Sequence, residues 1–256
     1  MKKYFNNNYL TKHLLNIQFH IYPNNNILEK KTSSYLYGIY KNINIFNLSK
    51  TIWNLKYLYY NLVKLFFEKN SFFIMAIHPT LKLKNLIDEL EHDLSIDKNY
   101  YLNNNLIIQG AIHLKWIAGF FSNRSIVQNW IKMVKNLQKG KYSKRYKYYR
   151  YILSMIKEKQ RYPLLPDFIL ILNNDSKASV ELIKSRIPLI GFVNNNISPE
   201  YFLYPIFGNN SSLASMEFFF TLLKTSLSES YLYEQEFLYL TILQKVKKIL
   251  YFKYNK

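Results

Sequence analysis

The sequence predicts an α/β fold: a doubly wound parallel sheet of about five strands, with an αα-hairpin inserted between its two halves. Two observations predict this class. Short, almost wholly apolar runs alternate along the chain with longer stretches of helical spacing, which is the order of elements in βαβ units. The run at residues 168–172 has no polar alternation, as expected of a strand that helices cover on both faces.

The first half of this pattern lies upstream of residue 113, and no element is predicted within residues 1–37. Strands are predicted at residues 43–48, 72–77 and 106–112, and helices at residues 49–69 and 81–94. The longer helix is indicated by Ile52, Leu55 and Leu62, which recur on one helical face.

The second half repeats the alternation. Strands are predicted at residues 168–172 and 189–193, and helices at residues 176–185, 211–226 and 230–252. Asp175 or Ser176 is placed to cap the first of these helices, and Pro188 introduces the strand after it. Residues 168–193 therefore predict a βαβ unit with a right-handed crossover. Upstream of it, two apolar helical faces separated by Gly140 predict the hairpin.

This pattern divides the chain into five segments. They are an N-terminal extension (1–34), a first part of the α/β domain (35–124), the inserted helical hairpin (125–162), a second part of the α/β domain (163–226) and a C-terminal helix (227–256).

The chain is strongly basic. It has 35 Lys and Arg against 16 Asp and Glu, a net charge of +19 and a pI near 9.7. Such a charge favours a polyanionic partner, first of all nucleic acid. No apolar run approaches the roughly 20 residues of a membrane span, so no membrane span is predicted. Abundant Asn, Lys, Tyr and Ile indicate A/T-rich codons, which enrich Lys without selection for RNA binding.

The same codon bias is typical of an organellar genome. Residues 1–8 contain neither an amphipathic presequence nor a signal-peptide core, so import into an organelle is not expected. We therefore expect a protein made and used inside an organelle, a mitochondrion in preference to a plastid.

Motifs of catalysis are missing from the sequence. No G-x-G-x-x-G follows a strand, and Ser49-Lys50-Thr51 resembles the end of a P-loop without its glycines. The strand ends at residues 173–174 and 194–196 carry amides where a nucleotide enzyme needs a carboxylate. There is no Cys, the five His are scattered, and the acids at residues 88–93 are expected to face solvent. We predict no catalytic residue, metal or cofactor; a nucleotide-binding α/β enzyme stays the alternative.

Cations and aromatic rings alternate within residues 139–161. The cations are Lys139, Lys141, Lys144, Arg145, Lys147, Arg150, Lys157, Lys159 and Arg161, and five Tyr lie among them. Phosphate contacts and base stacking suit such a segment, and a solvated hairpin face is the alternative. The loop at residues 208–212 could hold a phosphate or simply cap a helix. Trp116 is expected in the core.

Ordered motifs give a resemblance to a known family. Y-L-Y-G at residues 35–38 and I-N-I-F-N-L-S-K-T at 43–51 resemble F-I-F-G and H-I-I-N-L-E-K-T of the bacterial-type small-subunit ribosomal protein S2 family. K-W-I-A-G-F-F-S-N at 115–123 resembles R-W-L-G-G-x-L-T-N. L-P-D at 165–167, I-P-L-I at 187–190, N-N-N at 194–196 and I-F-G-N at 206–209 follow in the family's order.

The resemblance implies a flavodoxin-like sheet with a projecting helical hairpin, placed on the small ribosomal subunit against ribosomal RNA and neighbouring proteins. It implies no small-molecule substrate. We therefore expect a structural constituent of an organellar ribosome. A free RNA-processing factor is a further alternative. The residues expected to bind RNA are Lys41, Lys50, Lys115, Arg124, Lys139, Lys141, Lys144, Arg145, Lys147, Arg150, Asn209 and Asn210.

Overall fold

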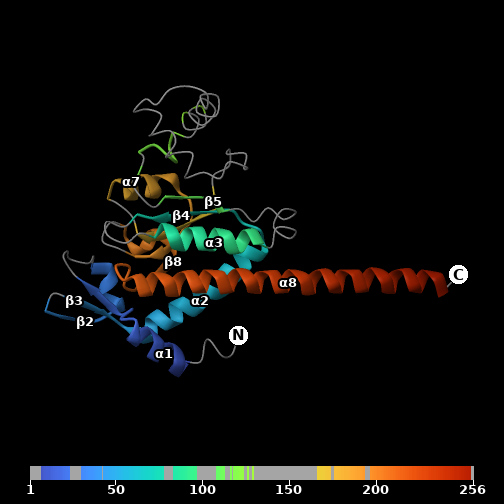
Figure 1. Cartoon of the computed structure of the whole chain (residues 1–256), viewed down its shortest axis with the longest axis horizontal. Coiled ribbons are helices and arrows are strands. Elements are labelled where there is room, and N and C mark those ends of the chain that lie inside the picture. Colours follow the sequence, from blue (N-terminus) through green and yellow to red (C-terminus); the bar gives the residue numbers. More distant parts are fainter. Residues whose placement is uncertain are drawn as a thin grey trace.

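A computed structural model of the chain is shown in Figure 1. It describes residues 7–23, 30–41, 43–77, 83–96, 108–112, 116, 118–123, 126, 129, 166–173, 176–193 and 197–254. The predicted hairpin therefore lies almost wholly outside the described residues, as do Asp175 and the amides at 174 and 194–196.

Five parallel strands form the central sheet. They are β4 (Phe72–Ala76), β5 (Ile108–Ile112), β6 (Phe168–Asn173), β7 (Leu189–Phe192) and β8 (Phe202–Ile206). Their order in the sheet is β5-β4-β6-β7-β8, so the chain first moves outward by one strand and then crosses back to the other side of β4. This reversal is the doubly wound, flavodoxin-like order. The predicted fold class is confirmed.

Helices cover both faces of the sheet. Helices α2 (Leu48–Phe67), α3 (Lys84–Ile96) and α8 (Leu213–Tyr254) pack on the face that carries Ile74 and Leu170. Helix α7 (Ser176–Ser185) packs on the opposite face, which carries Met75 and Ile171. Because neighbouring residues of a strand point to opposite faces, each fully apolar strand contributes to two cores.

The first strand predicted from the sequence, at residues 43–48, does not belong to the parallel sheet. Residues 43–48 were expected to open the βα alternation, but β3 (Ile43–Phe46) lies in a separate antiparallel sheet. Its partners are β1 (Ile21–Pro23) and β2 (Leu36–Tyr40). The fifth parallel strand is instead β8, for which no strand was predicted. It is an edge strand with an exposed Leu203 and with Pro205, which cannot donate to a ladder.

Two further expectations are corrected. Residues 1–37, where no element was predicted, contain α1 (Asn7–Asn16), the 3₁₀ helix η1 (Lys30–Tyr35), β1 and the start of β2. The two helices predicted at 211–226 and 230–252 are one continuous helix, α8, of 42 residues. No Gly or Pro interrupts it. Figure 1 shows α8 running past the body of the domain toward the C-terminus. No helix among the described residues is both long and apolar enough to cross a membrane.

Candidate nucleic-acid interface

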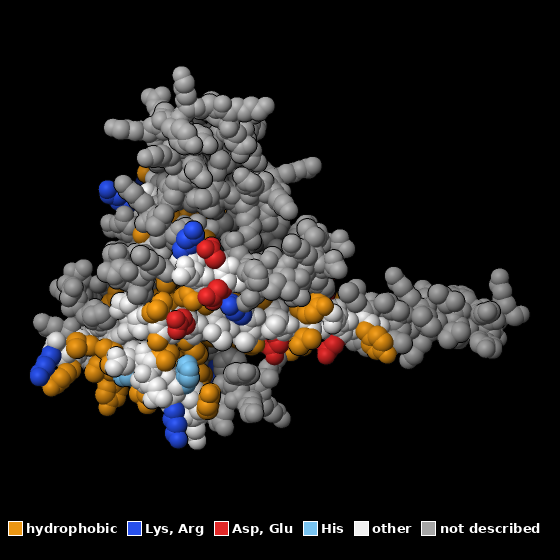
Figure 2. Space-filling model, viewed as in Figure 1, with side chains coloured by type: hydrophobic (Ala, Val, Ile, Leu, Met, Phe, Trp, Pro, Cys, Tyr) orange, Lys and Arg blue, Asp and Glu red, His pale blue; other side chains and the backbone are white. Residues whose placement is uncertain are grey.

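The positive charge of the chain is concentrated in two stretches. Residues 113–165 contain 13 Lys and Arg and a single Glu, and residues 238–256 contain five Lys and no acid. The side chains that the structure describes are mixed in sign, and Figure 2 shows Lys, Arg, Asp and Glu interspersed over the visible face. The expected RNA contacts Lys139, Lys141, Lys144, Arg145, Lys147 and Arg150 lie outside the described residues, and they stay predictions.

A turn at residues 118–123 follows β5 and belongs to the K-W-I-A-G-F-F-S-N motif. One carboxylate organises it: Glu181 on α7 accepts hydrogen bonds from three backbone N–H groups of the turn, those of Gly119 (2.9 Å), Phe121 (2.7 Å) and Ser122 (2.8 Å). The Ser122 hydroxyl lies 3.1 Å from the same carboxylate. Successive N–H groups of this kind form an anion-binding concavity. Here the anion is the protein's own side chain.

This arrangement limits what the turn can offer to RNA. Three of its backbone donors are occupied by Glu181, so phosphate would have to be held mainly by the flanking cations Lys115 and Arg124, which lie outside the described residues. Trp116 is buried, with its ring 5.9 Å from Phe121 between centroids, which confirms its predicted core position. Sequence reasoning missed Glu181, because nothing in the sequence links a lone acid on α7 to a turn 60 residues earlier.

The loop at residues 208–212 is held down by the segment after α1. The backbone N–H of Asn209 donates to the carbonyl of Phe19 at 2.8 Å. The side-chain oxygen of Asn209 accepts from the N–H (3.0 Å) and hydroxyl (2.6 Å) of Ser211. Asn209 and Asn210 are 7% and 4% exposed. The structure thus places both side chains that were predicted to bind RNA inside the fold. The side-chain amide of Asn209 stabilises the loop through its bonds with Ser211.

Lys50 lies in the first turn of α2, close to this loop. Its ammonium donates to the carbonyl of Ser34 at 2.5 Å and lies 5.8 Å from the centroid of the Tyr35 ring. Tyr35 in turn stacks on Phe207, with ring centroids 3.8 Å apart. A groove of about 410 Å³ opens here, lined by Ser34, Tyr35, Ser49, Lys50, Trp53 and Asn54. An exposed lysine beside an exposed indole suits a nucleotide phosphate and base.

The resemblance of residues 49–51 to a P-loop has a structural cause instead. The hydroxyl of Thr51 donates to the carbonyls of Asn47 and Phe207, at 3.1 and 3.2 Å. These bonds tie the start of α2 to the strand end before the 208–212 loop. The backbone N–H groups of Ser49 and Lys50 donate to the side chain of Asn47, and that of Thr51 donates to the Asn47 carbonyl, so these donors are not free for a nucleotide phosphate.

Lys41 is separated from these groups. It lies exposed at the tip of the β2–β3 hairpin with a positive φ of 44°, and its ammonium is 5.3 Å from the centroid of the Tyr40 ring. Tyr37, Ile39 and Tyr40 are also exposed on this hairpin. Of the predicted RNA-binding residues, Lys50 therefore lies beside Tyr35, which stacks on Phe207 directly before the 208–212 loop, whereas Lys41 lies at the tip of the β2–β3 hairpin.

The sequence predicted no metal site, and it predicted that the acids at residues 88–93 face solvent. Within the described part of the chain, no three His, Asp or Glu side chains gather as metal ligands would. Asp88 and Glu89 are exposed on α3, as predicted, and Glu89 faces Lys224 of α8 at 3.9 Å.

A comparison with protein families agrees with the motif order. The family model described as ribosomal protein S2 matches residues 14–230. The match begins within α1 and ends within α8, and so includes the whole parallel sheet, the turn held by Glu181 and the 208–212 loop.

Proposed function

The chain belongs to the ribosomal protein S2 family, and we propose that it binds small-subunit ribosomal RNA in a mitochondrial ribosome. Membership gives the chain a structural role in the small ribosomal subunit, in translation. The family match gives no support to the alternative of a nucleotide-binding α/β enzyme. The proposal adds the RNA contact, its location on the chain and the compartment.

The charge distribution supports the RNA contact. The described side chains are mixed in sign, whereas residues 113–165 carry 13 cations and one acid. A polyanion is therefore attracted mainly to this segment. Five Tyr interleave with the cations between residues 142 and 151, and rings of this kind stack on unpaired bases. Lys115 and Arg124 border the turn that Glu181 fixes to α7.

The composition supports the compartment. Only six Gly and seven Pro occur in 256 residues, beside 24 Tyr and 18 Phe, which is the result expected of A/T-rich codons in an organellar gene. Recovery of the chain with mitochondrial small subunits after fractionation is the expected outcome. Recovery with plastid small subunits would instead place the protein in the plastid.

The RNA contact is tested by Arg145→Glu combined with Arg150→Glu. Binding of the purified full chain to small-subunit ribosomal RNA should weaken by at least ~10-fold, and the slope of log affinity against log salt should fall by roughly 2. Arg is informative here because it is rare in this chain and its planar fork matches phosphate.

The matched control is Lys12→Glu combined with Lys84→Glu, which makes the same charge change at exposed positions of α1 and α3. It should weaken binding far less than the arginine pair. If both pairs weaken binding equally, attraction is a property of net charge alone. If neither does, the basic segment is a solvated face, and the proposed contact is wrong.

A further inference from the structure

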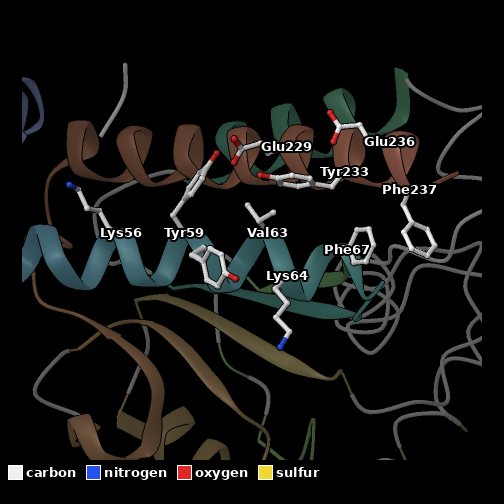
Figure 3. A pocket seen from close by; sticks show the side chains of 10 residues that line it. Lys56, Tyr59, Val63, Lys64, Phe67, Glu229, Tyr233, Glu236 and Phe237 are labelled. Carbon is white, nitrogen blue, oxygen red and sulfur yellow. The ribbon is translucent and has the colours of Figure 1, made fainter. Parts of the chain in front are cut away.

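A groove of about 720 Å³ runs between α2 and α8. Figure 3 shows Tyr59 and Val63 pointing from α2 toward α8, with Glu229 and Tyr233 opposite them. Phe67 and Phe237 meet edge to face near one end, with ring centroids 6.2 Å apart. Phe237 is 57% exposed. Aromatic and aliphatic side chains therefore make up most of the groove lining.

The α8 wall of the groove is acidic, whereas the α2 wall contributes Lys56 and Lys64. Glu236 is exposed and Glu229 is half-buried, and neither makes an ion pair within the described residues. Their neighbour Glu234 is already neutralised by Lys69 at 2.7 Å. Two carboxylates without cations are notable in a chain of net charge +19.

Glu229 has an unfilled hydrogen-bonding position. The Tyr59 hydroxyl bonds with its carboxylate, and burial together with this carboxylate raises the pKa of Tyr59. The Oε2 atom of Glu229 is buried and has no hydrogen-bond partner. A buried carboxylate oxygen without a donor is costly, so Glu229 favours an N–H donor at this wall of the groove over a phosphodiester group, which has none.

The dimensions of the groove suit a helix. Its α2 wall extends from Lys56 to Phe67, about 17 Å at 1.5 Å per residue, which is about three helical turns. An apolar trough between two helices is a common seat for the apolar face of a third.

We propose that this groove binds an amphipathic helix of a protein partner, about three turns long. Its apolar stripe would pack on Val63, Phe67 and Phe237, and a Lys or Arg at its edge would reach Glu229 and Glu236. The inference does not rest on the RNA contact proposed above, because the two surfaces share no residue.

Two synthetic 14-residue helical peptides test the groove. Both carry the same leucine stripe, and their flanks carry either Lys or Glu. Fluorescence anisotropy with the purified full chain should show the Lys peptide binding at least ~10-fold more tightly than the Glu peptide. A purely non-specific attraction gives the opposite preference, because the chain has a charge of +19.

Glu229→Gln combined with Glu236→Gln should weaken the Lys peptide by ~10-fold or more and leave the Glu peptide unaffected. The matched control is Glu200→Gln with Glu217→Gln, which removes two exposed acids outside the groove and should change neither affinity. A preference for the Glu peptide, or equal effects of the two pairs of substitutions, would overturn the proposal.

A second measurement uses the chain assembled in the small subunit. A photo-crosslinking p-benzoylphenylalanine at position 237 should join a helix of a neighbouring protein that carries Lys or Arg. Cross-links to ribosomal RNA, to a second copy of the chain or to another segment of the same chain would each contradict a protein helix as the occupant.

Discussion

Glu181, Gly119 and Gly191 determine the backbone at two close contacts, the turn at residues 118–123 and the approach of β7 to β6. The carboxylate of Glu181 receives the N–H groups of a turn whose Gly119 has a positive φ of 84°. Gly191 lies in β7, next to β6 in the sheet, with a φ of 139°, and a Cβ there would lie 2.0 Å from the carbonyl oxygen of Ile171. Only glycine combines that conformation with so close an approach of two strands.

Replacing Glu181 by Gln tests its role in the turn. The substitution keeps the shape of the side chain but removes the charge that strengthens its hydrogen bonds, and one of its two oxygens becomes an amide. We expect the free energy of unfolding to fall by about 1.5–3 kcal/mol, measured by urea denaturation of the full chain.

The matched control is Glu200→Gln, because Glu200 is exposed and not part of the turn. It should change the free energy of unfolding by no more than about 0.5 kcal/mol. Equal stability of the Glu181→Gln chain and the unaltered chain would show that the four contacts of this carboxylate contribute nothing net.

At the scale of elements, the spacing of the buried apolar residues was the signal that predicted strands and helices correctly. The apolar runs of β4, β6 and β7 and the spacing of α2 were sufficient to predict the parallel sheet and its helical cover. Edge elements were not predictable in this way. β3 is apolar enough to look like a parallel strand, and β8 contains Pro205, so only tertiary pairing decides which sheet each of them joins.

Helix α2 begins at a side-chain cap that the sequence motif contains. The Oδ1 atom of Asn47 accepts from the backbone N–H groups of Ser49 (3.1 Å) and Lys50 (3.4 Å). Asn47→Ala removes this cap, and we expect a loss of about 0.5–2 kcal/mol in the free energy of unfolding.

Asn54→Ala on the same helix serves as the control. Asn54 lies inside α2, where alanine is the better helix former, so this change should be neutral or slightly stabilising. Thermal and urea unfolding followed by circular dichroism measure both variants. A cap contribution is ruled out if the two variants have the same stability.

At the scale of the whole molecule, the candidate site was only partly predictable. Composition predicted a polyanionic partner, which stays a prediction, and the ordered motifs indicated the family that the comparison then matched over residues 14–230. The roles of individual polar residues were not predictable. Asn209 and Lys50 bond to backbone carbonyls or loop residues, because burial and long-range contacts, which one sequence does not reveal, determine what an amide or an ammonium faces.

Sedimentation tests the central claim most directly. An epitope-tagged chain from lysed mitochondria is centrifuged through a sucrose gradient at high salt, and each fraction is probed for the tag and for small-subunit ribosomal RNA. A built-in constituent of the subunit stays with the RNA, because its many contacts are satisfied together, whereas a loosely held RNA-binding factor is released as salt weakens phosphate contacts. We predict that the tag peaks with the small subunit at every salt concentration at which the subunit itself survives. A tag that moves to the top of the gradient while the subunit stays intact would contradict the account.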